Sequence, residues 1–265
     1  MTNNKAEESE PLLRPEKRLF KENDRSHELQ LRALAEERIA TLGSLAILRG
    51  LKETTITKLA SACSWRNVSK RQQIFSANDE SRDLYFLLSG KVRVILYSPQ
   101  GRRVSFGILE AGEMFGEIAA IDGLPRSAAV EAVQDCRLAV LSSASVERFV
   151  AEEPAFALIL LRKLAANVRH LSERIFEFSA LMVRQRTQAE LLRLAKLRGD
   201  GSKQVLLSPA PTTVEIAARI GTRHEQVSRE IVRLIKDGLL QRVDGDLLIL
   251  DLDRLSDLVR EARGE

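Results

Sequence analysis

The chain has 265 residues, of which 44% are hydrophobic and 29% are charged, a balance typical of a globular protein with a buried core. No apolar run approaches the ~18 residues of a membrane helix, and the first residues lack the apolar stretch of a secretion signal. We therefore expect a cytoplasmic protein without a membrane partner. Two cysteines and three histidines, scattered along the chain, do not form a disulfide framework or a metal-binding motif.

The formal net charge of +4 is mild, but the charges are unevenly distributed. Residues 1–50 carry nine basic and nine acidic side chains, whereas the segment from Arg184 to Arg233 has ten basic and five acidic ones. The surplus of positive charge therefore lies late in the chain.

The chain is predicted to begin with a highly charged extension, residues 1–40, that contains Pro11 and Pro15. Its composition is typical of a mobile tail, so we expect poor order at its start. A helical pattern from His27 onward predicts that the extension ends as a helix.

Residues 41–150 are predicted to form a β-domain. Many short strands at regular spacing across residues 51–145 indicate a β-sandwich or jelly roll rather than a parallel sheet. β-rich runs such as LYFLLSG, KVRVILYS and RRVSFGIL alternate with turn signals at Ser89 and Gly90, at Pro99 to Gly101, and at Gly112.

A long dimerisation helix is predicted over residues 151–185, because the apolar residues change there to a spacing of alternately three and four. This heptad seam continues for about three heptads and favours pairing with an identical helix. Packing of the helix on its own domain is the alternative. The seam consists of Leu161, Leu164, Val168, Leu171, Ile175, Phe178 and Met182.

A helix-turn-helix is predicted in the C-terminal part of the chain. Thr212 with Glu215 is a capping box that starts the first helix, and Gly221 permits the tight turn to the second. Thr222 with Glu225 repeats the capping signal. The strand-like run QVLL precedes these two helices.

The second helix of this motif is expected to expose a polar first turn. Val227, Ile231 and Leu234 have the spacing of a face that packs on the first helix. Asp244 and Gly245 give the hairpin signal of a β-wing after the helix. The side chains left exposed are those of Arg223, His224, Glu225, Ser228 and Arg229.

This order of elements resembles the CRP/FNR family of bacterial transcription regulators, named after the catabolite activator and the fumarate-nitrate regulator. The resemblance covers roughly residues 45–250. It implies an α+β fold with an N-terminal β-roll or jelly-roll cyclic-nucleotide-binding domain, a long dimerisation helix, and a winged helix-turn-helix over residues 186–265. It also implies a homodimer that binds double-stranded DNA at an inverted-repeat operator, with RNA polymerase as a further partner if the protein is an activator.

The stretch EMFGEIAAIDGLPRSAAVEA, residues 113–132, resembles the phosphate-binding cassette of that family. A cyclic phosphate is an anion that needs donors at close range, and Arg126 can supply a charged fork. Glu117 can accept from the ribose 2′-hydroxyl, whereas an ion pair between Glu117 and Arg126 that closes a loop is the alternative. The cassette residues expected to bind the ligand, including the start of a short helix, are Gly116, Glu117, Ile118, Arg126 and Ser127.

The resemblance also implies base contacts from the dimerisation helix, where the family's activator has a threonine followed by a serine. Leu171 and Ser172 occupy these positions here. Leu171 cannot hydrogen-bond a base edge, while Ser172 either reaches the nucleotide or remains a solvated surface residue. The effector is therefore expected to be cAMP, cGMP or both.

Glu225, Ser228 and Arg229 match the Glu-x-x-Ser-Arg recognition pattern of the family, with His224 where the cAMP-dependent activator has arginine. Arginine can donate two hydrogen bonds to guanine and glutamate can accept from cytosine, so these residues are expected to bind a G·C-containing half-site. A helix cap for Glu225 and a solvated helix face for Arg229 are the alternatives. The residues expected to contact phosphates are Arg223, Arg219 and Lys203.

Other activities of this architecture have little support in the sequence. Cys63 and Cys136 do not supply a cysteine cluster, and none of the histidines is placed as a haem ligand, so no metal, haem or iron–sulfur cluster is expected. No catalytic pattern predicts an enzyme. Two alternatives to a nucleotide-controlled regulator remain: the same architecture with a degenerate, ligand-independent pocket, and a cyclic-nucleotide sensor that acts mainly through a protein partner.

Overall fold

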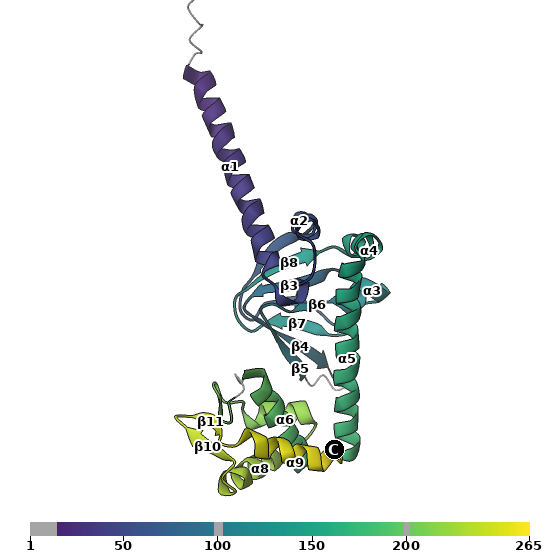
Figure 1. Ribbon diagram of the computed structural model, residues 1–265, viewed down its shortest axis with the longest axis vertical. Coiled ribbons are helices and arrows are strands. Elements are labelled where there is room, and N and C mark those ends of the chain that lie inside the picture. Colours follow the sequence, from purple (N-terminus) through teal and green to yellow (C-terminus); the bar gives the residue numbers. More distant parts are fainter. Residues whose placement is uncertain (1–14, 98–102, 199–201) are drawn as a thin grey trace, which may run out of the picture.

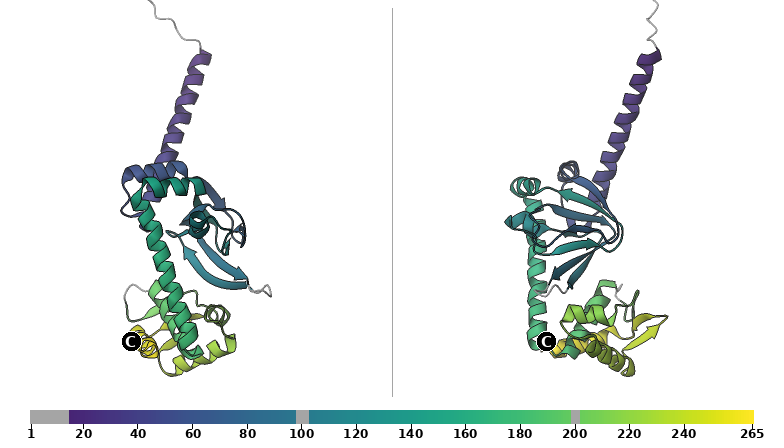
Figure 2. Two further views of the ribbon diagram at one scale, coloured as in Figure 1. Left: turned by 90° about the vertical axis from the view of Figure 1, so that its right-hand side faces the viewer. Right: turned by 180° about the vertical axis from the view of Figure 1, so that it is seen from behind.

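The computed structural model describes residues 15–97, 103–198 and 202–265, without the side chains of residues 15–28, 97 and 103–106. Figure 1 shows a projecting helix α1 (Pro15–Gly43), a β-domain, a long helix α5 (Pro154–Ala180) and a C-terminal domain. In Figure 1 and in the right-hand view of Figure 2, the two domains lie on the same side of α5. The opposite side of its lower part carries no other ribbon.

The β-domain consists of two four-stranded antiparallel sheets, which agrees with the predicted jelly roll. The strand orders are β1-β8-β3-β6 and β2-β7-β4-β5, and side chains from both sheets, such as Leu87 and Val130, pack into a common core. The strands are β1 (Ser64–Val68), β2 (Gln73–Phe75), β3 (Leu84–Ser89), β4 (Lys91–Tyr97), β5 (Arg103–Glu110), β6 (Met114–Phe115), β7 (Ala129–Ala132) and β8 (Cys136–Leu141).

Helices cover one end of the β-domain and share a second core with it, in which Leu59, Phe86 and Phe156 are buried. One of them lies within the segment predicted to be β-rich, so that prediction was wrong for residues 53–62. Besides α1 and α5, the helices here are the 3₁₀ turn η1 (Ala46–Leu48), α2 (Glu53–Ala62), α3 (Glu117–Asp122) and α4 (Ser143–Glu152).

Helix α1 begins at Pro15, earlier than the helical pattern from His27 predicts. Proline suits the first turn of a helix because the backbone N–H that it lacks has no partner there. The end of α1 is docked on the β-domain, where the guanidinium of Arg38 lies 5.3 Å from the centre of the Trp65 ring. The expected disorder at the chain start, residues 1–14, and the turn at residues 99–101 lie outside the described residues.

Helix α5 carries the predicted seam on an exposed face, and Leu161, Val168 and Ile175 are each more than 60% exposed. Its first turns pack instead into the β-domain core. The helix ends at Ala180, and the extended backbone of Leu181 separates it from the next helix. The seam therefore ends before Met182, its last predicted residue.

The C-terminal domain is a winged helix-turn-helix. The capping box of Thr212 and Glu215 is present, and Gly221 has the left-handed conformation (φ 62°) that the tight turn needs. Asp244 and Gly245, both with positive φ, close the wing hairpin. The elements are α6 (Val183–Arg198), β9 (Val205–Leu207), α7 (Thr213–Ile220), α8 (His224–Lys236), β10 (Leu240–Val243), β11 (Asp246–Ile249) and α9 (Leu252–Arg263).

Candidate functional site

The cassette starts where strand β6 passes into helix α3, and Gly116 makes this junction. Its φ of 81° is left-handed, and a Cβ at this position would lie 2.8 Å from both Arg126 Nη1 and the carbonyl oxygen of Asp83. Both the backbone conformation and the available space therefore require glycine. The short helix expected near Glu117 is confirmed as α3.

Arg126 is buried at the centre of the cassette, with only 2% of its surface exposed. It donates from Nη1 to the carbonyl of Gly116 at 3.0 Å, from Nη2 to the carbonyl of Asp83 at 2.9 Å, and from Nε to Ser81 Oγ at 3.1 Å. Its guanidinium carbon lies 4.2 Å from the centre of the Phe75 ring. Burial lowers the pKa of Arg126, and nearby oxygen groups oppose this shift.

Glu117 is 6% exposed and faces helix α5 rather than Arg126. Its Oε1 accepts a hydrogen bond of 2.9 Å from Asn167 Nδ2 of that helix. Among the described residues there is no ion pair between Glu117 and Arg126, so the alternative of a loop-closing pair is wrong. The sequence analysis missed Asn167, although a short amide next to the apolar seam residue Val168 was a signal for a buried polar contact.

A cavity of about 470 Å³ opens beside the cassette, within the ~300–1,000 Å³ typical of small-molecule sites. Of the predicted ligand residues, Ser127 lines this cavity, whereas Glu117 and Arg126 do not. Ile118 is exposed on α3. The lining consists of Gln73, Ser76, Ala77, Asn78, Leu96, Ser127 and Ala129.

Leu171 and Ser172 lie on the exposed face of α5. No hydrogen bond among the described residues joins either of them to the cassette. Within one chain, Arg126 therefore contacts Gly116 and the neighbouring Glu117 contacts α5, whereas the two predicted base-contact residues are open to a neighbour or to solvent.

The first turn and a half of α8 forms an exposed polar surface, as predicted, because Val227, Ile231 and Leu234 are buried against the domain core. The second capping box was a wrong prediction: Arg223 is the N-cap and makes no side-chain cap, and the Thr222 hydroxyl contacts Gln226 instead. The exposed residues are Arg223, His224, Glu225, Ser228 and Arg229.

Glu225 takes part in no helix cap, so the alternative of a purely structural capping role for it is wrong. Its Oε1 lies 3.5 Å from Nε2 of His224, and both side chains are more than half exposed. Of the predicted phosphate contacts, Lys203 is largely exposed, whereas Arg219 donates to Glu190 at 3.0 Å.

Two segments of the chain match known domain families. Residues 65–153 match the cyclic nucleotide-binding domain, and residues 185–258 match the Crp-like helix-turn-helix domain. The chain belongs to the CRP/FNR family. This family consists of DNA-binding transcription regulators with a cyclic-nucleotide-binding domain rather than of enzymes.

This chain aligns with nearly the full length of similar proteins of the family. A CRP-like cAMP-activated global transcriptional regulator of Mycobacterium tuberculosis is 24% identical over 81% of this chain and 96% of its own. The cAMP-activated global transcriptional regulator Vfr of Pseudomonas aeruginosa is 25% identical over 78% of this chain and 98% of its own.

Solved CRP/FNR structures have the same fold. A CooA variant from Carboxydothermus hydrogenoformans has a TM-score of 0.64 at 25% identity, covering 75% of this chain and 88% of its own. FixK2 from Bradyrhizobium japonicum has a TM-score of 0.63 at 20% identity, covering 74% and 96%.

In the part of the chain that the structure describes, no group of three or more His, Cys, Asp or Glu side chains could hold a metal ion. Both cysteines are free and buried, and burial raises the pKa of the Cys63 thiol to about 12. Every described helix is too short or too polar to cross a lipid bilayer.

The Arg126 contacts predict a loss of stability. Arg126→Ala removes the charged donor to the carbonyls of Gly116 and Asp83, so the free energy of unfolding should fall by roughly 1.5–3 kcal/mol. Urea denaturation followed by circular dichroism measures this change. The control is Arg82→Ala, which removes an exposed arginine between Ser81 and Asp83, the two neighbours that Arg126 contacts. Equal stability of the two variants would show that the buried contacts do not hold the cassette.

Proposed function

We propose that this CRP/FNR protein is a homodimeric, sequence-specific DNA-binding regulator in the cytoplasm, and that cAMP, cGMP or both control it. The observation that carries the proposal is the contact between Glu117 of the cassette and Asn167 of α5. It links the candidate nucleotide site directly to the helix that continues into the DNA-binding domain. Calorimetric titration with both nucleotides, followed by DNA binding with and without them, is the decisive experiment.

The ligand is proposed to bind with its phosphate at Arg126 and Ser127 and its ribose at Glu117. A guanidinium has five N–H donors, and the three protein contacts of Arg126 leave donors for an anion. Because Asn167 contacts Oε1 of Glu117, the other carboxylate oxygen can accept from the 2′-hydroxyl. Ser127 joins these groups to the adjoining cavity.

The nucleotide is proposed to act on α5 through Asn167. A hydroxyl that donates to the other oxygen of Glu117 draws charge from the carboxylate and changes how strongly this carboxylate holds Asn167 of the helix. A ligand shifts a conformational equilibrium only when it interacts differently with the two states, and this shared carboxylate supplies such a difference. The effector signal therefore starts with a change in one hydrogen bond to α5.

The homodimer is proposed to form through the apolar face of α5. Leu161, Val168 and Ile175 are exposed there, and one side of the lower part of this helix carries no other ribbon (Figure 2). A contiguous exposed apolar face of this kind marks an interaction site, and the heptad spacing favours an identical helix. Two-fold pairing also brings Leu171 and Ser172 of each chain next to the partner, where either can reach a nucleotide.

Helix α8 is proposed to enter the major groove with Glu225, Ser228 and Arg229 at the base edges and His224 beside them. Arg223 and Lys203 are proposed to contact phosphates. A two-fold dimer then requires an inverted-repeat operator with half-sites one helical turn, ~34 Å, apart. RNA polymerase is a further partner if the protein activates transcription.

The choice of nucleotide differs among the similar proteins. The relatives from Mycobacterium tuberculosis and Pseudomonas aeruginosa are named cAMP-activated, whereas the structurally similar CLP of Xanthomonas campestris is described as c-di-GMP responsive. Because Leu171 offers no hydrogen bond to a base, we propose that this protein binds both cAMP and cGMP with similar affinities.

Ligand-independent regulation is the second candidate. It is favoured by the contacts of Arg126, since three N–H groups of its guanidinium already have protein acceptors. In this case neither nucleotide would bind, while the operator would still be recognised. The titration distinguishes the two candidates.

Glu117→Gln tests the ribose contact. We expect it to weaken binding of the ribonucleotide by about tenfold, because an uncharged amide oxygen is a poorer acceptor for the 2′-hydroxyl. Affinity for the 2′-deoxy analogue, which lacks this donor, should change much less, as measured by calorimetry. Equal losses for both ligands would mean that Glu117 only holds the loop.

Leu171→Thr tests the base contact. The new hydroxyl should change the ratio of cAMP to cGMP affinity in favour of cAMP by up to about tenfold, with some loss of dimer stability. Val168→Thr places the same change one turn earlier on the same exposed face, so it should weaken the dimer without changing the ratio. An unchanged ratio in Leu171→Thr would remove position 171 from the base site.

Arg229→Ala and Arg223→Ala separate base reading from phosphate contact. Arg229→Ala should reduce the free energy of binding to the operator by about 1–3 kcal/mol and relax the preference at one G·C pair of the half-site. Arg223→Ala should weaken all sequences alike and reduce the dependence of affinity on salt. Fluorescence anisotropy with single-base operator variants at several salt concentrations measures both effects. A direct-repeat operator would contradict the proposed dimer geometry.

A further inference from the structure

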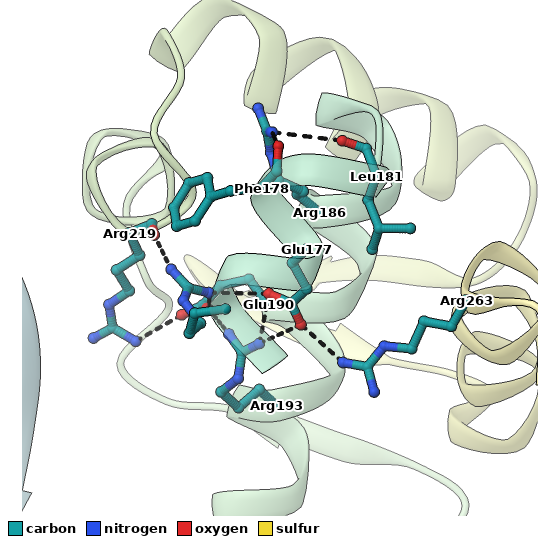
Figure 3. Close-up of polar contacts among 9 residues, drawn as sticks. Glu177, Phe178, Leu181, Arg186, Glu190, Arg193, Arg219 and Arg263 are labelled. Atoms are coloured by element: carbon teal, nitrogen blue, oxygen red, sulfur yellow. Dashed lines mark hydrogen bonds and ion pairs between the residues drawn. The ribbon is translucent and has the colours of Figure 1, made fainter. Parts of the chain in front are cut away.

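The C-terminal end of α5 is joined to the C-terminal domain by a cluster of two buried glutamates and four arginines (Figure 3). Its members come from four helices and lie on both sides of the extended backbone that ends α5. The arginine–glutamate cluster consists of Arg174 and Glu177 of α5, Glu190 and Arg193 of α6, Arg219 of α7, and Arg263 of α9.

Glu177 is the centre of one half of the cluster, and its side chain is only 2% exposed. Its Oε1 accepts from Arg193 Nη2 at 2.7 Å and from Arg263 Nη2 at 2.8 Å, and its Oε2 lies 3.3 Å from Arg174 Nη1. One carboxylate of α5 is therefore bound to helices α6 and α9 of the DNA-binding domain.

Glu190 is the centre of the other half, with a side chain that is 3% exposed. Its Oε1 accepts from Arg219 Nη1 at 3.0 Å, and its Oε2 contacts Arg174 and Arg193. Arg174 also donates to the backbone carbonyl of Arg219. The arginine of α5 thereby reaches the last turn of α7, directly before the turn to the recognition helix.

Phe178 of α5 also packs against the turn between α7 and α8. The Phe178 ring lies between the guanidinium groups of Arg174 and Arg186, at 5.3 Å and 5.4 Å from its centre. A Cβ at Gly221 would lie 2.8 Å from Cε1 of Phe178. Phe178, predicted for the dimer seam, therefore also packs against the helix-turn-helix of its own chain.

These contacts specify a geometry more than they add stability. An unpaired buried charge has a large desolvation cost. The two buried carboxylates are therefore stable only in a geometry that keeps their arginine partners in contact with them. Burial and the neighbouring Arg193 lower the pKa of Arg174, while the two carboxylates oppose this shift. A rotation of the DNA-binding domain about the end of α5 would separate Glu177 from Arg263 and Arg174 from α7.

We propose that the arginine–glutamate cluster positions the recognition helix α8 relative to α5, and so sets the half-site separation that the dimer accepts. The proposal rests on the proposed function only for the operator-spacing measurement. Glu177 and Glu190 are positioning residues: Glu177 acts through Arg193 of α6 and Glu190 through Arg219 of α7, and both helices pack on α8.

The test uses the full chain and Glu177→Gln, which keeps the side-chain shape and removes the charge. Cysteines replace the exposed Arg169 of α5 and Lys236 of α8 and carry spin labels; both native cysteines are buried. Labelled chains are diluted with unlabelled ones, so that pulsed electron resonance measures the distance within one chain. We expect one narrow distance distribution in the parent and a broadened or shifted one in Glu177→Gln.

The matched control is Asp257→Asn, which breaks an exposed ion pair with Arg260 on α9 and should leave the distribution narrow. If Glu177→Gln does not fold, Arg263→Gln removes only the link to α9 and should broaden the distribution in the same way. A folded variant of either kind with the parent's distribution would overturn the proposal.

Operator spacing supplies the second readout. The parent should prefer the natural half-site separation over one changed by two base pairs by about tenfold or more, and Glu177→Gln should reduce this preference to about threefold or less. A uniform loss of affinity with the preference unchanged would mean a merely structural role. If the parent binds no DNA, the proposed function fails, whereas the distance measurement still decides the role of the cluster.

Discussion

Helix α5 is one continuous helix that makes three different sets of contacts along its length, and both domains are positioned by these contacts. Its first turns bury Phe156 in the β-domain core, its middle offers Asn167 to the cassette, and its end places Glu177 in the DNA-binding domain. Ten residues separate Asn167 from Glu177, about 15 Å along an α-helix. A displacement of the helix at the cassette therefore reaches the DNA-binding domain without an intervening joint.

Arg126 illustrates how the fold and the candidate site share one group. The guanidinium holds Gly116, Asp83 and Ser81 together, so the proposed phosphate donor is held in place by the protein itself. A preorganised donor loses little conformational freedom on binding, which favours affinity. The same arrangement couples binding to stability, and a substitution at Arg126 has to be analysed for both.

The sequence predicted what depends on neighbours in the chain and missed what depends on distant ones. The apolar face of α5, the cap at Thr212 and the hairpin turn at Asp244 follow from local spacing and backbone preference. The bond between Asn167 and Glu117 joins residues 50 positions apart, and Arg263 reaches Glu177 across 86. The second capping box failed for a local reason, because the Thr222 hydroxyl found the Gln226 side chain.

The projecting helix α1 affects how the particle moves in solution. Its 29 residues correspond to a rod of about 43 Å, and only its last turns are docked on the β-domain in Figure 1. A body with such a rod experiences more friction than a sphere of equal mass and elutes early from a sizing column. Subunit number is therefore better measured by sedimentation equilibrium or light scattering, which report mass independently of shape.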